Sequence, residues 1–153
     1  MTDFSPIRDR LLALCNGNQQ AVALIEGILH LAEVYDDLID KDGRITNDDI
    51  HQAFNFMLFG LPANQVYREQ PTIQVTIMNA MTTWRAANVM EKTGDTETLH
   101  ASYVMRMSPY NVATHIVMCV AGQEAAIKAA MLLYSRGDKG AFASYLNEHA
   151  RKE

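Results

Sequence analysis

The sequence predicts an all-α fold, a single helical bundle of six or seven helices over residues 1–153. Apolar residues recur roughly every three or four positions through most of the chain, which is the spacing of one helix face. Capping residues and Gly or Pro breaks divide this pattern at short intervals. The one strand-like alternation, Ile73, Val75 and Ile77, runs on at helical spacing into Trp84, so we expect no sheet.

Caps and breakers set the helix boundaries. Asn18, Thr46 and Asp95 are residue types that accept hydrogen bonds from the first turn of a helix, and Asp49 is placed to complete a capping box with Thr46. Residues 60–70 are expected to be irregular, and Ser108-Pro109 either starts a new helix or kinks the preceding one. The expected helices cover about residues 6–15, 19–40, 47–59, 71–93, 96–107, 108–136 and 138–153, packed with antiparallel neighbours.

Composition excludes several classes of protein. The chain is 48% hydrophobic with only 8 Gly and 4 Pro, so it is neither disordered nor collagenous. A net charge of −5 disfavours binding to nucleic acid or to an anionic membrane. No apolar stretch approaches the roughly 20 residues that span a bilayer, and the N-terminus lacks the features of a signal peptide. Two separate cysteines, Cys15 and Cys119, indicate reduced thiols, so we expect a cytoplasmic protein.

The chemistry of the sequence is concentrated in residues 33–43, where acids crowd the end of the second helix. At about 100° per residue, Glu33, Asp37 and Asp40 share one stripe with Glu26 and His30, opposite the apolar stripe. Acids at a helix C-terminus are each unfavourable by about a few tenths of a kcal/mol, because the helix dipole is negative there. A divalent cation would neutralise both the carboxylates and the carbonyl end, so we predict a metal site.

Asp36-Asp37-Leu38-Ile39-Asp40 resembles the Asp-Asp-x-x-Asp motif of class I isoprenoid (terpenoid) synthases. In that all-α family the motif holds Mg²⁺ ions that bridge to a substrate diphosphate, and hard oxygen ligands suit Mg²⁺. The resemblance implies Asp36 and Asp40 as metal ligands, and Asp37 as a ligand or the neighbour of one. Arg44 could contact a phosphate, and Glu33, Asp42 and His30 are further candidates for the same site.

The family's second acidic motif has no counterpart here, because the only acids beyond residue 100 are Glu124, Asp138, Glu148 and Glu153. The resemblance therefore implies half of a terpenoid-synthase-like bundle, completed by a homodimer. The ligand would be a diphosphate-bearing small molecule or a nucleotide. The motif is compatible with binding alone and with a Mg²⁺-dependent transferase or hydrolase.

The acidic segment is also similar to that of a family of small, uncharacterised phage and prophage proteins. These carry an Asp-Asp-Leu-Ile-Asp-Gly-Asp-like stretch after an apolar helix, with Lys41 here in place of a Gly. Their Asn-Pro-Phe-Tyr-like turn corresponds to residues 64–67, and a helix with a Trp follows, as with Trp84. This resemblance implies no activity. It places the protein in the cytoplasm of a phage host.

Two other metal sites compete with this interpretation. Residues 38–49 resemble an EF-hand loop set on Gly43, but Leu38 stands at its first ligand position, so Ca²⁺ is the less favoured ion. Glu33-x-x-Asp36 matches one half of the Mg²⁺ site of all-α nucleotide pyrophosphohydrolases, without a partner Glu-x-x-Glu.

The rival interpretation is a non-catalytic helical accessory or interaction protein, in which the acids form a solvated helix end. A ligand site requires them to line a concavity with a basic residue opposite, whereas a solvated end requires neither. Arg85, Asn88 and Arg106 could each reach an anionic ligand, but we expect them on solvated helix faces. Alanines at positions 125, 126, 129 and 130 permit a close helix approach, which favours a dimer.

Overall fold

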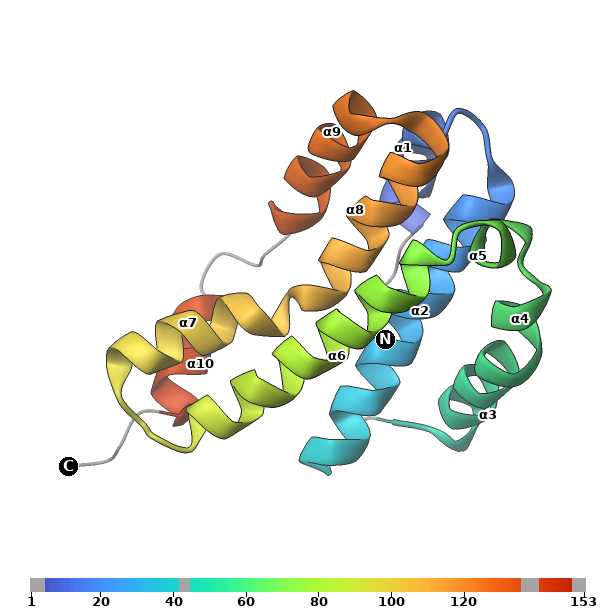
Figure 1. Ribbon diagram of the computed structural model, residues 1–153. Coiled ribbons are helices and arrows are strands. Elements are labelled where there is room, and N and C mark those ends of the chain that lie inside the picture. The colour runs from blue at the N-terminus through green and yellow to red at the C-terminus, as the bar shows by residue number, and fades with distance from the viewer. Residues whose placement is uncertain (1–4, 42–44, 136–140, 150–153) are drawn as a thin grey trace.

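The computed structural model describes residues 5–41, 45–135 and 141–149, and all the regular structure in these ranges is helical (Figure 1). The predicted all-α class is confirmed. None of the helices in this part of the chain is both long and apolar enough to cross a membrane. The elements are α1 (Ser5–Leu14), α2 (Gln19–Asp40), α3 (Asn47–Asn55), the π-helical η1 (Phe56–Gly60), α4 (Leu61–Ala63), α5 (Gln65–Glu69), α6 (Thr72–Glu91), α7 (Thr96–Arg106), α8 (Ser108–Ala121), α9 (Gln123–Tyr134) and α10 (Ala141–His149).

The predicted caps begin the helices as expected. The Asn18 side chain accepts a hydrogen bond from the Ala21 amide at 3.0 Å and starts α2. Thr46 and Asp49 form a reciprocal capping box at the start of α3, and the Asp95 side chain accepts from the Thr98 amide at the start of α7. Each cap satisfies an amide that has no partner inside its own helix, so these boundaries are set locally.

The predicted single helix over residues 108–136 is wrong, because the chain breaks at Gly122. This residue has φ 82° and ψ 178°, in a region that glycine adopts far more readily than other residues. The break lets α9 fold back along α8 (Figure 1). Ala126 and Ala129 of α9 are buried after this turn. The close helix approach that these alanines permit therefore occurs within the chain.

The prediction of an irregular segment over residues 60–70 is also wrong. The chain continues from α3 through η1 into α4, and then forms the short helix α5. The buried Asn64 explains why α5 begins where it does. Its side chain accepts a hydrogen bond from the Tyr67 amide at 3.1 Å and donates one to the Gln20 carbonyl at 2.8 Å. One side chain thus caps α5 and joins it to the beginning of α2.

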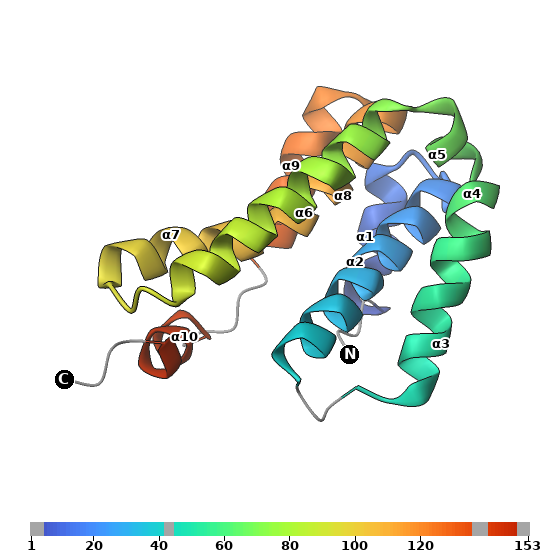
Figure 2. The ribbon, with the colours of Figure 1, turned by 60° about the horizontal axis from the view of Figure 1, so that its bottom comes forward.

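The core lies between α2 and α8, with α1, α5, α6 and α9 around it. The interior side chains of α2 include Leu24 and Ile25, and those of α8 include Val112 and Ile116, all fully buried. Helix α6 packs on α8 and continues beyond the core, where α7 packs along it and α10 packs on α7 (Figures 1 and 2). Because α6 and α7 extend past the core, the end of α2 and the end of α7 come to face each other.

Helix α2 approaches η1 closely at Gly27. A Cβ atom at this position would lie 2.1 Å from Phe56 Cε2 and 2.4 Å from Phe56 Cζ, far inside van der Waals contact. The Phe56 ring thus packs directly on the α2 backbone. Glycine in the middle of a helix costs about 0.5–1 kcal/mol relative to alanine, and here the ring contact explains its presence.

We predict that Gly27→Ala destabilises the protein by about 1–3 kcal/mol, because the added methyl group overlaps the Phe56 ring. Helix propensity alone predicts the opposite sign. Urea denaturation monitored by circular dichroism measures the effect. In a Phe56→Leu background the same substitution should be neutral or stabilising, and an unchanged penalty there would contradict the contact.

Candidate functional site

Arg106, the last residue of α7, joins three carboxylates from two other helices. Its Nη2 donates to Asp36 Oδ1 at 2.5 Å and to Asp40 Oδ2 at 3.2 Å, both at the end of α2. Its Nη1 donates to Glu91 Oε1 at 2.8 Å and to Asn88 Oδ1 at 3.3 Å, both on α6. A guanidinium carries five N–H donors in a fixed plane, so one of its edges can donate to residues of α2 while the other donates to residues of α6.

The charges in this cluster do not balance. One guanidinium faces the carboxylates of Asp36, Asp40 and Glu91, and only 18% of the Arg106 side chain is exposed. Burial raises the pKa of Asp36, and repulsion from the carboxylates of Asp40 and Asp37 raises it further. Arg106 lowers this pKa but does not cancel the effect of burial. Burial would lower the pKa of Arg106, but its bonds to Glu91 and Asp36 outweigh this and raise the pKa. The cluster therefore retains an excess of negative charge.

Helix α10 fixes the α6 side of the cluster. The Tyr145 hydroxyl lies 2.8 Å from both Glu91 Oε1 and Ser102 Oγ. The buried Ser102 also donates to the Ala87 carbonyl at 3.0 Å, which ties α7 to α6. Burial, reinforced by the negative charge of Glu91, raises the pKa of Tyr145 to about 12, so its hydroxyl remains a proton donor.

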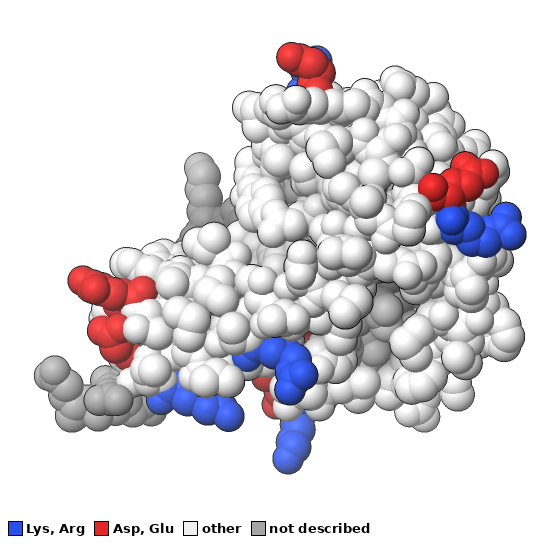
Figure 3. Space-filling view, in the orientation of Figure 1, with Lys and Arg blue, Asp and Glu red and all other residues white. Residues whose placement is uncertain are grey.

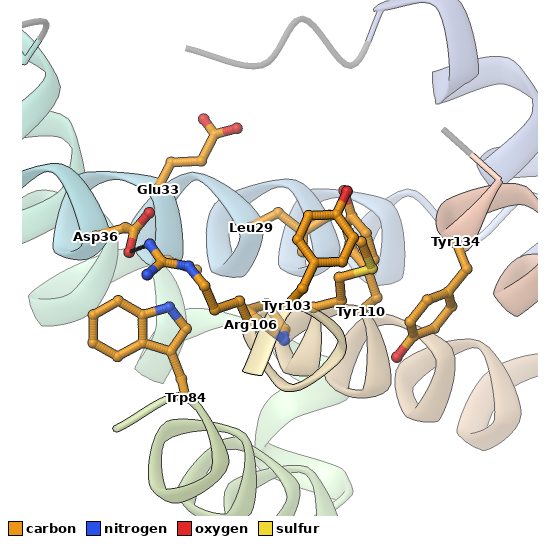
Figure 4. A pocket seen from close by; sticks show the side chains of 11 residues that line it. Leu29, Glu33, Asp36, Trp84, Tyr103, Arg106, Tyr110 and Tyr134 are labelled. Atoms are coloured by element: carbon orange, nitrogen blue, oxygen red, sulfur yellow. Dashed lines mark hydrogen bonds and ion pairs between the residues drawn. The ribbon is translucent and has the colours of Figure 1, made fainter. Parts of the chain in front are cut away.

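A cavity of about 290 Å³ opens beside Arg106 between α2, α6, α7, α8 and α9. Figure 4 shows Asp36, Arg106 and Trp84 at one end of it and Tyr110 and Tyr134 at the other. The guanidinium also lies over the Trp84 ring, with Cζ 5.6 Å from the ring centroid. The lining residues are Leu29, Ala32, Glu33, Asp36, Trp84, Tyr103, Arg106, Met107, Pro109, Tyr110 and Tyr134.

A second cavity, of about 280 Å³, is lined almost wholly by apolar side chains. It shares Ala32, Trp84 and Pro109 with the first cavity, so the two have part of their walls in common. Its other lining residues are Ile28, Leu31, Tyr35, Met57, Ile77, Ala80, Met81 and Val112.

The structure separates the residues predicted for the metal site. Asp36 and Asp40 meet at Arg106, and Glu33 lines the same cavity as Asp36. Asp37 is half-buried and is not among the carboxylates that Arg106 contacts. Both ring nitrogens of His30 are buried and have no hydrogen-bond partner among the described residues. Asp42, Gly43 and Arg44 lie outside the described residues, as does most of the predicted turn.

Within residues 5–41, 45–135 and 141–149, no three His, Cys, Asp or Glu side chains are grouped so that they could hold a metal ion. The predicted trio of Asp36, Asp37 and Asp40 is not such a group as it stands. A cation at this cavity would need to take further ligands from water or from a bound anion.

The expectation that Arg106 lies on a solvated helix face is wrong, whereas Arg85 is exposed as expected. Glu91, Ser102 and Tyr145 also belong to the cluster and were not predicted from the sequence. One signal was present: Ser102 and Arg106 are four residues apart on α7, so they share one helix face. Their partners on α6 could not be assigned without knowing how α6 and α7 pack.

No family model, curated protein or solved structure matches the chain.

We predict that Arg106→Met destabilises the protein by about 2–4 kcal/mol at pH 7, because it leaves the partly buried carboxylates of Asp36 and Glu91, and the more exposed Asp40, without their cation. Burial already raises the pKa of Asp36 although Arg106 opposes the shift, so without the guanidinium this pKa lies further above its unfolded value. Stability is then regained as the pH falls through the raised folded-state pKa of Asp36. The loss should therefore be smaller at pH 4.5 than at pH 7.

Urea denaturation at the two pH values measures this difference. Arg85→Met, on the exposed face of α6, is the matched control and should change stability by less than about 0.5 kcal/mol. An Arg106→Met penalty that is equal at both pH values would show that lost packing, rather than unpaired charge, is responsible.

Proposed function

We propose that the protein binds a diphosphate group together with Mg²⁺ at the cavity beside Arg106. The observation that supports this most directly is the bridge from Arg106 to Asp36 and Asp40, at 2.5 and 3.2 Å. Asp36 and Arg106 lie at one end of a cavity that Glu33 also lines, and Arg106 holds Asp40 beside Asp36. This meets the sequence-based criterion for a site, which requires acids lining a concavity with a basic residue opposite.

The absence of a three-carboxylate group within the described residues is compatible with Mg²⁺. This ion is usually held by one or two carboxylates, with water and substrate phosphate oxygens completing an octahedral shell. Ca²⁺ takes about six to eight oxygen ligands, which makes it the less suitable ion for Asp36 and Asp40. The proposed role of the protein is therefore to supply part of the shell, and the ligand supplies the rest.

Binding would exchange partners within the cluster. Mg²⁺ would take the carboxylates of Asp36 and Asp40, which frees the Nη2 edge of Arg106 for a phosphate oxygen. Glu91 and Asn88 hold the Nη1 edge and keep the side chain in place. The pKa of Asp36 is raised mainly by burial, with smaller contributions from Asp40 and Asp37, and the cation would offset both effects by stabilising the ionised carboxylate. Each charge thus keeps an opposite charge before and after the exchange.

The other predicted site residues have lesser parts in this proposal. Glu33 lines the cavity, and Asp37 adds negative charge beside Asp36. His30, whose buried nitrogens belong to a different part of α2, has no role in it. Transfer or hydrolysis of the diphosphate, kinship with half of a terpenoid synthase bundle, and an origin in phage within a host cytoplasm all remain predictions of the sequence.

We predict that Mg²⁺ with pyrophosphate raises the Tm more than either alone. A ligand at about 100 times its Kd adds about 2.7 kcal/mol, which is a shift of several degrees for a chain of this size. Asp36→Asn should abolish the shift, and Asp37→Asn, the adjacent carboxylate outside the bridge, should retain most of it.

Differential scanning fluorimetry measures the shift, and circular dichroism shows that each variant is folded. Millimolar Mg²⁺ and pyrophosphate that leave the wild-type Tm unchanged would contradict the proposal. A shift of the same size in folded Asp36→Asn would contradict it as well.

A second candidate is the non-catalytic interaction protein, with a second copy of the chain as its partner. The observation that favours it is an exposed stripe on α6 formed by Val75, Met78 and Val89, which are 57%, 68% and 66% exposed. Figure 3, in the orientation of Figure 1, shows few charged side chains on the surface that α6 and α8 turn toward the viewer. Exposed apolar surfaces of this kind often mark interfaces.

The spacing of this stripe suits two antiparallel copies of α6. Val75 and Val89 are each seven residues from Thr82, so a two-fold axis at Thr82 would pair Val75 of one copy with Val89 of the other. Met78 is four residues before Thr82 and would meet Ala86 of the other copy in the same arrangement. A two-fold interface needs such a self-complementary patch.

We predict a concentration-dependent dimer that Met78→Glu converts to a monomer, because a charge would be buried at the centre of the interface. Sedimentation velocity at about 1–100 μM measures the association. Ile127→Glu, at another exposed apolar position, is the control and should leave the dimer intact. A wild-type chain that is monomeric throughout this range would exclude the second candidate.

A further inference from the structure

The cavity beside Arg106 has two chemically different ends. Asp36, Arg106 and Trp84 lie at one end, and Tyr110 and Tyr134 lie at the other, with Tyr103 between them (Figure 4). The proposed function uses only the charged end. The tyrosine end is not required to hold Mg²⁺ or a diphosphate, so it offers information about the rest of the ligand.

The tyrosine rings are held in place by their neighbours. The rings of Tyr110 and Tyr134 pack edge to face, with centroids 5.4 Å apart and planes at 80°. The Tyr134 hydroxyl donates to Asn111 Oδ1 at 2.8 Å, which fixes that ring at both ends. Burial, with a smaller contribution from Tyr110, raises the pKa of Tyr134, so the phenol stays neutral.

Tyr103 packs against two aromatic side chains of α10. Its ring lies 4.8 Å from the ring of Phe142 and 5.1 Å from that of Tyr145, measured between centroids. The three cavity tyrosines therefore come from α7, α8 and α9 and are each braced by another side chain. Rings that are already ordered lose little conformational entropy when a ligand packs against them.

The two ends together restrict the ligand. The charged end suits an anion bound with a cation, and the tyrosine end suits a flat ring with polar edges, because a phenol offers both a π face and a hydroxyl. A purely aliphatic chain would instead fit the apolar cavity on the other side of the shared wall. The volume of about 290 Å³ is at the lower limit of ligand pockets, which indicates a single small ring system.

From these features we infer that the ligand is a nucleoside diphosphate, with its base packed against Tyr110 and Tyr134 and its diphosphate at Asp36 and Arg106. This inference rests on the proposed function, because it assigns the diphosphate to the same end of the cavity. The new element is the identity of the group attached to the diphosphate, which we assign as a nucleoside. The base gains affinity by stacking, which tolerates different bases because each presents a π face.

Isothermal titration calorimetry of the full chain in saturating Mg²⁺ tests the inference with two probes, pyrophosphate and ADP. ADP should bind about ten- to a hundredfold more tightly than pyrophosphate, the increment expected for one stacked base. Tyr134→Leu should remove most of this difference and change pyrophosphate affinity by less than about twofold. Phe59→Leu, which removes an exposed ring on η1, should leave both affinities unchanged.

The outcomes separate the inference from the proposed function. Pyrophosphate binding with ADP no tighter would overturn the nucleotide inference and leave the diphosphate site standing. Binding of neither probe would overturn both. The wild-type comparison needs no variant, so it decides the inference even where Tyr134→Leu fails to fold. If Tyr134→Leu is folded and binds ADP as tightly as wild type does, the base does not lie at the tyrosine end.

Discussion

A single guanidinium shared by three carboxylates holds this structure together where its helices diverge. Arg106 joins the end of α2 to α6, and Tyr145 brings α10 to the same point through Glu91. Beyond the apolar core, this cluster and the packing of Tyr35 on Trp84 join α6 and α7 to the end of α2, because the deepest buried side chains lie nearer the other end of α2. The ionic contact is therefore one of the interactions that set how α7 lies against α2.

Stability alone is a poor reason for such a cluster. Burying an ion pair rarely improves on apolar packing of the same volume, and here the carboxylates outnumber the cation. The acids at the end of α2 also oppose the helix dipole. Under the proposed function, a bound cation would bring the positive charge that this cluster lacks.

Trp84 links this charged region to the apolar part of the molecule. One ring serves both cavities, with Arg106 over it at 5.6 Å and Tyr35 packed against it at 5.1 Å between centroids. The polar and apolar cavities are thus adjacent without being alike. The exposed stripe of α6 belongs to the opposite side of the same helix, so binding and association could proceed on different surfaces.

Features that depend on neighbouring residues can be predicted from the sequence. The caps at Asn18, Thr46 and Asp95, and the crowding of acids at residues 36–40, are visible because each involves positions within one or two helical turns. The packing of the helices, in contrast, brings Asp36 and Asp40 to Arg106, which is 70 and 66 residues away, and leaves Asp37 outside this contact. Packing also determines that α8 ends at Gly122. A single glycine within a continuous helical pattern ends the helix only where tertiary contacts stabilise the turn. Which acids converge depends on how helices pack, and that is a property of the whole fold.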